Sequence, residues 1–180
     1  RNDYIRFPSE WERNEEVFRI LDEQTGNNTE VSIACAVQAL NIYYIPDLIE
    51  WKLEQNFKKI NMWPFGAGGV NYHFVYWPPH LNVKIFPLWF KEKTKQKYED
   101  FYPWWEKNWE KGIPSWHKGK VTYEKWREAG YGIKRLEGMI NFMFQEDWSR
   151  RMPEFQEYII LNDRVRGTDF TKTFYGMEDL

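Results

Sequence analysis

The chain has 180 residues and a formal net charge of −2, and 19% of its residues are aromatic, including 11 tryptophans. This length is sufficient for one sizeable domain, and the small charge excludes a general attraction to nucleic acid or to anionic membranes. A single cysteine excludes an intramolecular disulfide framework and is typical of a reducing compartment. Since no stretch is long and apolar enough to span a membrane, we expect a cytoplasmic protein without membrane partners.

The first 24 residues predict a polar loop followed by a helix. Residues 1–8 are loop-like, and Ser9 and Glu12 have the spacing of a capping box, which marks a helix start. The apolar side of this helix consists of Trp11, Val17, Phe18 and Leu21.

Residues 31–51, VSIACAVQALNIYYIPDLIEW, predict the central strand and helix of the fold. The first half is an apolar run that is too short for a good helix and is typical of a strand buried in a parallel sheet. The second half has a helical pattern, with Pro46 acceptable in the first turn and Asp47 facing the positive end of the helix dipole. Together they form one β/α unit.

The two faces of the predicted strand differ in size. The bulky face consists of Val31, Ile33, Cys35 and Val37, and the small face of Ser32, Ala34, Ala36 and Gln38. We expect the bulky face to pack under helices, with Cys35 as a buried, inert thiol, and the small face to border open space. Gln38 and Asn41 follow at the carboxyl end of the strand, where α/β proteins bind their ligands.

Further strands are expected after this unit. Residues 57–62 predict a short strand, residues 66–69 a glycine-rich turn, residues 70–76 an alternating strand and residues 81–86 another short strand. Helices and strands in this order predict an α/β fold with parallel strands. Asn71 and His73 share one face of the strand at 70–76, although a lone strand histidine is also typical of a hydrogen-bonded core residue.

The second half of the chain changes character. Residues 91–97 are rich in lysine, tryptophans follow, residues 122–147 predict a long helix, and a final helix follows Pro153 before an irregular tail. We expect two parts, residues 1–87 with the sheet and residues 88–180 as a helical extension packed on it. The lysines fit either a nucleic-acid surface or a solvated helix face over an aromatic core, and the negative net charge favours the helix face.

Four segments in the same order resemble the radical S-adenosylmethionine (SAM) enzymes, specifically the twitch-domain-containing radical SAM proteins of phages and bacteria. They are NDYIRFPSEWE (2–12), residues 31–51, HFVYWPPHLNVKIFP (73–87) and LNDRVRGTDFTKTF (161–174). The resemblance covers nearly the whole chain. It implies the C-terminal half of a partial (β/α)6 TIM-like barrel with parallel strands, followed by a helical, aromatic-rich C-terminal extension.

The resemblance also implies an activity. Radical SAM enzymes reductively cleave SAM at a [4Fe–4S] cluster to give a 5′-deoxyadenosyl radical that modifies a substrate. The cluster is held by a CxxxCxxC loop that would precede this chain, and Cys35 alone cannot hold it, so we expect no metal ligands here and no activity of this chain by itself. The implied partners are the N-terminal half of the same protein, an external electron donor and an unknown substrate, a peptide or another macromolecule.

Five residues are candidates for the site. Arg6 can pair with the SAM carboxylate or a substrate anion, or act as a loop arginine bound to backbone carbonyls. Gln38 and Asn41 can bind the ribose hydroxyls of SAM or the substrate, although Asn41 also fits a helix cap. We expect Asn71 and His73 to border the substrate cavity.

A different class of function also fits the sequence. The chain can be a non-catalytic α/β binding module whose tryptophan- and lysine-rich tail engages a protein or nucleic-acid partner. The resemblance involves the predicted barrel segments as well as the tail, so we favour the enzyme.

Overall fold

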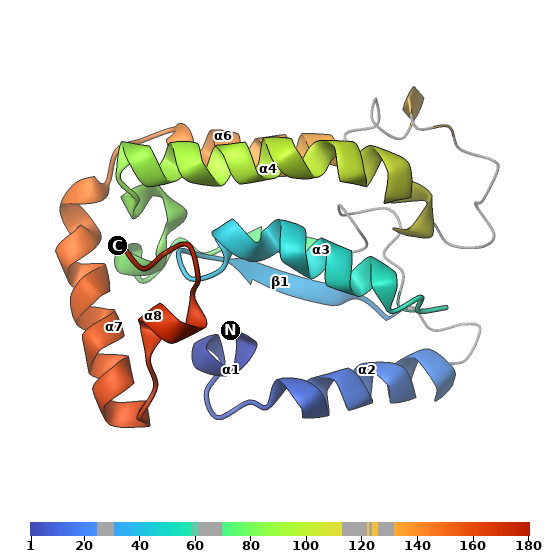
Figure 1. The fold of residues 1–180 in the computed structure, drawn as a ribbon, viewed down its shortest axis with the longest axis horizontal. Coiled ribbons are helices and arrows are strands. Elements are labelled where there is room, and N and C mark those ends of the chain that lie inside the picture. Colours follow the sequence, from blue (N-terminus) through green and yellow to red (C-terminus); the bar gives the residue numbers. More distant parts are fainter. Residues whose placement is uncertain (25–30, 59, 61–69, 113–121, 123, 126–131) are drawn as a thin grey trace.

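The computed structural model describes residues 1–24, 31–58, 60, 70–112, 122, 124–125 and 132–180. This part of the chain is a mostly helical α/β fold built on two strands, β1 (Ile33–Val37) and β2 (Val70–Phe74) (Figure 1). The strands pair in parallel, with Ile33 opposite Val70 and Val37 opposite Phe74. The predicted parallel α/β arrangement is therefore confirmed. Within the described residues the sheet has two strands and is not closed.

The two faces of β1 differ as the sequence predicts. Val37 is buried, and Cys35 is partly buried and packs against the apolar core. Ser32 and Ala34 are exposed on the small face. Gln38, which follows the strand, is buried with 8% of its surface exposed, so the open face ends before it.

Helix α3 (Ile45–Glu54) follows β1 after a 3-10 turn at Ile42–Tyr44. Pro46 lies in the first turn of α3, where its missing N–H is not needed, and Asp47 is the acidic residue of that turn, as predicted. Ile45, Ile49 and Leu53 bury one side of the helix.

Part of the N-terminal segment predicted as a loop is helical. Residues 2–5 form a short helix, α1 (Asn2–Ile5), and the expected longer helix is α2 (Trp11–Gln24). Ser9 does not cap α2. Its hydroxyl instead accepts hydrogen bonds from the side-chain amides of Asn2 (3.2 Å) and Asn14 (2.8 Å), and it thereby ties α1 to α2.

The predicted strand at 81–86 is wrong. The chain instead forms 3-10 turns at Pro79–Leu81 and Val83–Ile85, in which the N–H groups of Leu81, Asn82 and Ile85 donate to the carbonyls three residues earlier. The side chain of Asn82 accepts the N–H of Lys84 at 3.0 Å and starts the second turn.

The described residues of 57–62 are not a strand either. Asp22 of α2 accepts the N–H of Lys58 at 2.8 Å and that of Ile60 at 2.9 Å, so a carboxylate takes the donors that a strand ladder would use. Residues 59, 61 and 62 of this prediction, and the turn at 66–69, lie outside the described residues.

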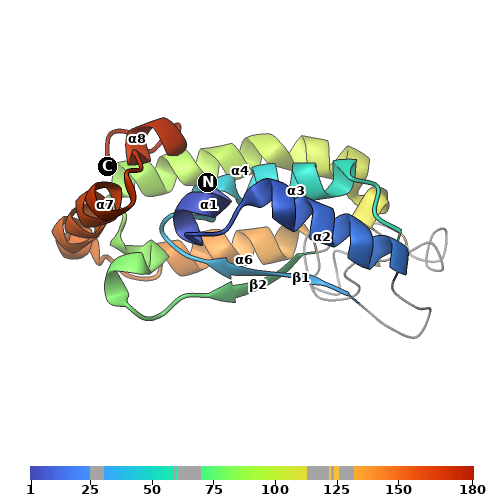
Figure 2. The ribbon, with the colours of Figure 1, turned by 90° about the horizontal axis from the view of Figure 1, so that it is seen from below.

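The second half of the chain is helical, as predicted. It contains α4 (Leu88–Asn108), which continues as a 3-10 turn at Trp109–Gly112, then α6 (Ile133–Phe144), a 3-10 turn at Ser149–Arg151, α7 (Met152–Arg166) and α8 (Phe170–Thr173). Helices α4 and α6 run side by side, and α7 crosses their end (Figures 1 and 2).

The helix predicted over 122–147 is present as α6, with residues 124–125 also helical and residues 123 and 126–131 outside the described part. Gly132 precedes α6 with φ of 66°, a conformation that glycine adopts without strain. The final helix and its position are confirmed by α7, whereas the tail contains the short helix α8.

One apolar cluster joins the sheet and its helices. Tyr98 of α4 is buried within it and donates its hydroxyl to the carbonyl of Ile42, at 2.7 Å. The extension thus packs directly on the β1–α3 unit, while the boundary at residue 87 stays a prediction. Within the described residues, no helix has both the length and the apolar composition needed to cross a membrane.

The tail packs on α1. Phe174 is fully buried and meets Tyr4 edge-to-face, with ring centroids 5.0 Å apart. It also stacks on Phe170 at 4.8 Å. The guanidinium of Arg166 donates to the carbonyl of Tyr4 at 2.9 Å, so residues at the two ends of the described chain hold α1 in place.

We therefore expect Phe174→Ala to lower the free energy of unfolding by about 3–5 kcal/mol, because it empties a buried aromatic site. Its neighbour Tyr175 is 68% exposed, and Tyr175→Ala should change stability by less than about 0.5 kcal/mol. Urea denaturation followed by circular dichroism measures both. Equal losses for the two variants would contradict the packing of the tail.

Candidate functional site

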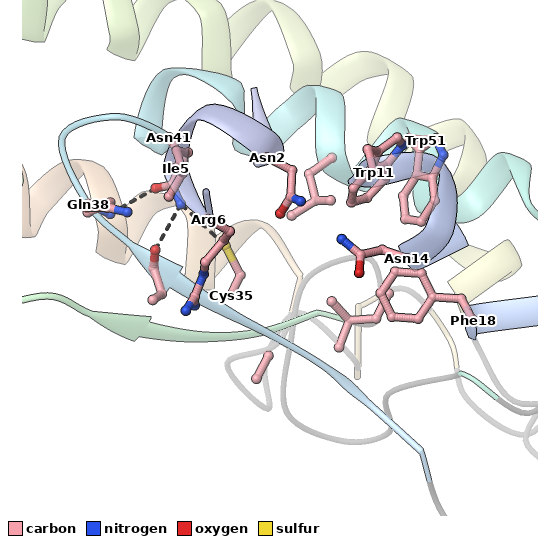
Figure 3. Close-up of a pocket in the computed structure, with 14 residues that line it drawn as sticks. Asn2, Ile5, Arg6, Trp11, Asn14, Phe18, Cys35, Gln38, Asn41 and Trp51 are labelled. Atoms are coloured by element: carbon pink, nitrogen blue, oxygen red, sulfur yellow. Dashed lines mark hydrogen bonds between the residues drawn. The ribbon is translucent and has the colours of Figure 1, made fainter. Parts of the chain in front are cut away.

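A cavity of about 170 Å³ lies between β1 and the helices α1 and α2 (Figure 3). Arg6, Gln38 and Asn41 all line it, so the structure brings together the three residues predicted to bind the cofactor. A second cavity, of about 440 Å³, shares much of this lining and extends to Arg1 and Asp47.

The side chain of Asn41 is bonded to the free edge of β1. Val37 accepts the N–H of Val75, so its polar groups face β2, and those of Ala36 and Gln38 face the opposite edge. The amide of Asn41 donates to the carbonyl of Ala36 and accepts the N–H of Gln38, both at 2.8 Å, and it has a longer contact of 3.8 Å with the sulfur of Cys35 (Figure 3).

Asn41 therefore does on this edge what a peptide group of a neighbouring strand would do. Both polar groups of its amide are bonded to the backbone of β1. These bonds fit a structural role of Asn41 better than the predicted binding to a ligand. The role differs from a helix cap, because its side chain makes no hydrogen bond to the turn that follows.

The side chains of Gln38 and Arg6 have no hydrogen-bond or ion-pair partner among the described residues. Among the described residues, the amide of Gln38 has no hydrogen-bond partner, although the residue is buried at the cavity wall. Arg6 ends α1 and is exposed, and its guanidinium has no ion pair and no backbone carbonyl partner in the described part of the chain. Figure 3 shows its side chain reaching down beside Cys35. The two side chains can therefore offer an amide and a fixed positive charge to a ligand.

Cys35 is the thiol of the cavity wall. Burial raises its pKa to about 11, and the nearby charge of Arg6 opposes this rise. At neutral pH the sulfur is therefore protonated, which makes it a poor nucleophile and a poor metal ligand. Cys35 packs against the core as expected, although it also lines the cavity, and its inertness stays a prediction.

An aromatic wall closes the cavity beside α3. The indole N–H groups of Trp11 and Trp51 both donate to the carboxylate of Glu15, at 3.0 and 2.7 Å. The two indole rings meet edge-to-face with centroids 4.7 Å apart, and Phe18 packs against both. Sequence reasoning recognised Trp11 and Phe18 only as an apolar helix side and missed Glu15, although the i, i+4, i+7 spacing places all three together.

Asn71 and His73 lie elsewhere on the sheet. They are opposite Ala34 and Ala36 on β2, and are half-buried and exposed respectively. Neither belongs to the lining of the cavity that contains Arg6 and Gln38. They share the small, open face of the sheet, so the structure separates these two candidates from the other three.

No group of three His, Cys, Asp or Glu side chains that could hold a metal is found among the described residues.

The lysines of α4 are mostly bonded within the protein. Lys91, Lys93 and Lys97 each have an internal partner, and Lys95 is exposed and 3.8 Å from Glu99. The partners are the carbonyl of Glu146 at 2.9 Å, the carbonyl of Gly176 at 2.7 Å and the carboxylate of Asp47 at 2.6 Å, respectively. The predicted solvated face is thus correct for Lys95 but wrong for Lys91, which is buried.

Comparison with known proteins identifies no relative. No family model matches the chain, and neither the curated proteins nor the solved structures contain a match.

Replacing Asn41 tests its role on the strand edge. We expect Asn41→Ala to lower the free energy of unfolding by about 1–3 kcal/mol, because the carbonyl of Ala36 and the N–H of Gln38 lose their partner. Asn71→Ala is the matched control and should cost less, since no hydrogen bond of its side chain is observed in the described structure. Chemical denaturation measures both, and similar values would contradict the edge role.

The pH dependence of Cys35 alkylation tests the contact with Arg6. The rate should rise with pH around a midpoint of about 11, because only the thiolate reacts and burial disfavours it. Arg6→Gln should move this midpoint further up, since the positive charge lowers the pKa. Arg13→Gln, on the exposed side of α2, should leave it unchanged. An unchanged midpoint in Arg6→Gln would show that the guanidinium does not act on the sulfur.

Proposed function

We propose that this chain forms one wall of the SAM and substrate cavity in a cytoplasmic radical SAM enzyme. In this proposal residues 1–87 are the C-terminal half of a partial (β/α)6 barrel, and residues 88–180 are the helical extension that covers it. The N-terminal half of the same protein would supply the cluster, and an external donor the electron.

The observation that carries the proposal is a cavity at the carboxyl end of β1 that is lined by two polar side chains, the amide of Gln38 and the guanidinium of Arg6. Gln38 and Arg6 line one cavity and have no side-chain partners among the described residues. Polar groups that converge on a pocket at this end of a strand are typical of ligand sites in α/β proteins. The order of the four resembling segments selects SAM among such ligands.

The residues present fit SAM in chemistry. Gln38 would hold ribose hydroxyls through its amide, and Arg6 would pair with a carboxylate, either that of SAM or that of a substrate. Trp11 and Phe18 offer apolar rings to the remainder of the ligand and limit the access of water. Bound SAM supplies a 5′-deoxyadenosyl radical after one-electron reduction, which is chemistry of the cofactor rather than of these side chains.

The [4Fe–4S] cluster does not fit the residues of this chain. Its three thiolates are lacking, and the one cysteine is protonated at neutral pH. We therefore assign to this chain the binding and positioning of SAM and substrate, and no step of the reaction.

The binding-module alternative has less support. Its nucleic-acid form needs free lysines on α4, and Lys91, Lys93 and Lys97 are used inside the protein. Trp105 and Trp109 of this region are buried in the core and present no stacking surface, whereas Trp89 at the start of α4 is 47% exposed.

Calorimetric titration of SAM into the chain tests the proposal. SAM should bind, and Gln38→Ala should weaken binding by about 3- to 10-fold, because one neutral hydrogen bond is worth about 0.5–1.5 kcal/mol. Asn71→Ala, outside the cavity, should bind like the unmodified chain. Absence of binding, or equal affinity in both variants, would reject this site.

The proposal predicts which sequence is encoded upstream of this chain. The reading frame upstream of Arg1 should encode a CxxxCxxC sequence, and the longer product, reconstituted anaerobically, should absorb as an iron–sulfur protein and cleave SAM. A reading frame of domain length without this sequence would contradict the enzyme.

A further inference from the structure

Helix α7 has large apolar side chains on two different faces. Its inner face is buried and consists of Phe155, Ile159 and Asn162. Outside this stripe, three aliphatic side chains are 58, 58 and 74% exposed, namely Ile160, Leu161 and Val165. A helix with one covered face normally carries polar residues on the other, and a helix that is apolar on both faces is typically covered on both.

The outer face of α7 lies at one end of the molecule. The helix crosses the end of α4 and α6, and its neighbours lie on one side of it (Figures 1 and 2). An upstream strand of the proposed barrel would join β1 beside α2 rather than pack on α7. The exposure of this face is therefore a question separate from the SAM cavity.

The outer face also carries two charges that the helix does not pair. Glu157 and Arg164 are exposed, and no ion pair of either is observed among the described residues. They are seven positions apart, about 10 Å along the axis, whereas charges pair within a helix at a spacing of three or four. Arg151 and Glu154 have such a spacing and pair at 3.0 Å.

The order of these residues is self-complementary. The midpoint between Glu157 and Arg164 coincides with the midpoint between Ile160 and Leu161. A two-fold axis through this point would place Glu157 of each copy opposite Arg164 of the other, and Ile160 opposite Leu161. Two ion pairs would then flank an apolar contact, whereas a parallel helix pair would bring like charges together. Two-fold contacts of this kind are the commonest between identical chains.

We propose that the outer face of α7 binds a second copy of this chain as an antiparallel helix pair. One helix face buries less than the roughly 800 Å² per partner of a standard interface, so the dimer should be weak, with a Kd of roughly 10–100 µM. The proposal does not rest on SAM binding, because the outer face of α7 contributes no residue to the cavity.

Sedimentation equilibrium of the chain tests the proposal. Across this concentration range the mass should rise from one copy to two. Leu161→Glu should weaken the dimer at least tenfold, because it puts carboxylates into the apolar contact. Ile20→Glu, at a 43% exposed position of α2, is the matched control and should leave the dimer unchanged. Circular dichroism should show the same helix content in both variants, since both positions are exposed.

Charge exchange tests the antiparallel arrangement. Glu157→Arg and Arg164→Glu should each weaken the dimer about tenfold, because each change replaces two attractive pairs by two repulsive ones. The double variant should dimerise like the unmodified chain, and an equimolar mixture of the two single variants should form mixed dimers. Arg135→Glu, on an exposed position of α6, changes the net charge as Arg164→Glu does and should have no effect.

Three results would overturn the proposal. They are a single-copy mass at every concentration, equal effects of Leu161→Glu and Ile20→Glu, and a double variant that stays as weak as the single ones. Titration of SAM is a separate measurement. A chain that binds SAM as a monomer would reject only the helix pair, and a dimer that does not bind SAM would reject only the proposed function.

Discussion

The structure around the cavity depends on how the two edges of β1 are bonded. β2 satisfies one edge, and the amide of Asn41 satisfies the end of the other. Because this amide reaches back from the turn to the strand, the chain turns at once into the 3-10 turn and then into α3. The same bonds fix the backbone of Gln38, whose side chain forms part of the cavity wall. A single polar side chain thus determines both the exit from the strand and the position of a candidate ligand contact.

Much of the central unit could be predicted from local sequence. The alternation of bulky and small residues identified β1 and its inner face, and Pro46 placed the start of α3. The strand expected at 81–86 failed because the side chain of Asn82 takes a backbone donor, which no periodicity records. Arg6, Gln38 and Asn41 line one cavity, and their role in binding a cofactor stays a prediction. Asn71 and His73 were not separable from them by sequence, because the order of strands decides that β2 lies on the edge of β1 away from α2.

Several lysine and arginine side chains of this protein are bonded to groups of the same chain. The lysines of α4 suggest a basic surface when the sequence is considered alone, yet most of them reach backbone carbonyls or Asp47. The same holds for Arg166, whose guanidinium bonds the carbonyl of Tyr4. Arg6 differs from these cations because no partner of its own is observed in the described residues. Arg6 also lines the cavity, so its charge is available there.

The contact between α1 and the tail has a consequence for biosynthesis. Arg166 and Tyr4 are separated by 162 positions, and Phe174 closes over the same helix from still further along the chain. The ribosome makes α1 long before the residues of the tail that support it. Arg6 therefore stays without its final surroundings until Phe174 has been made, and a nascent chain stalled before residue 166 would carry β1 with an α1 that the tail does not yet hold.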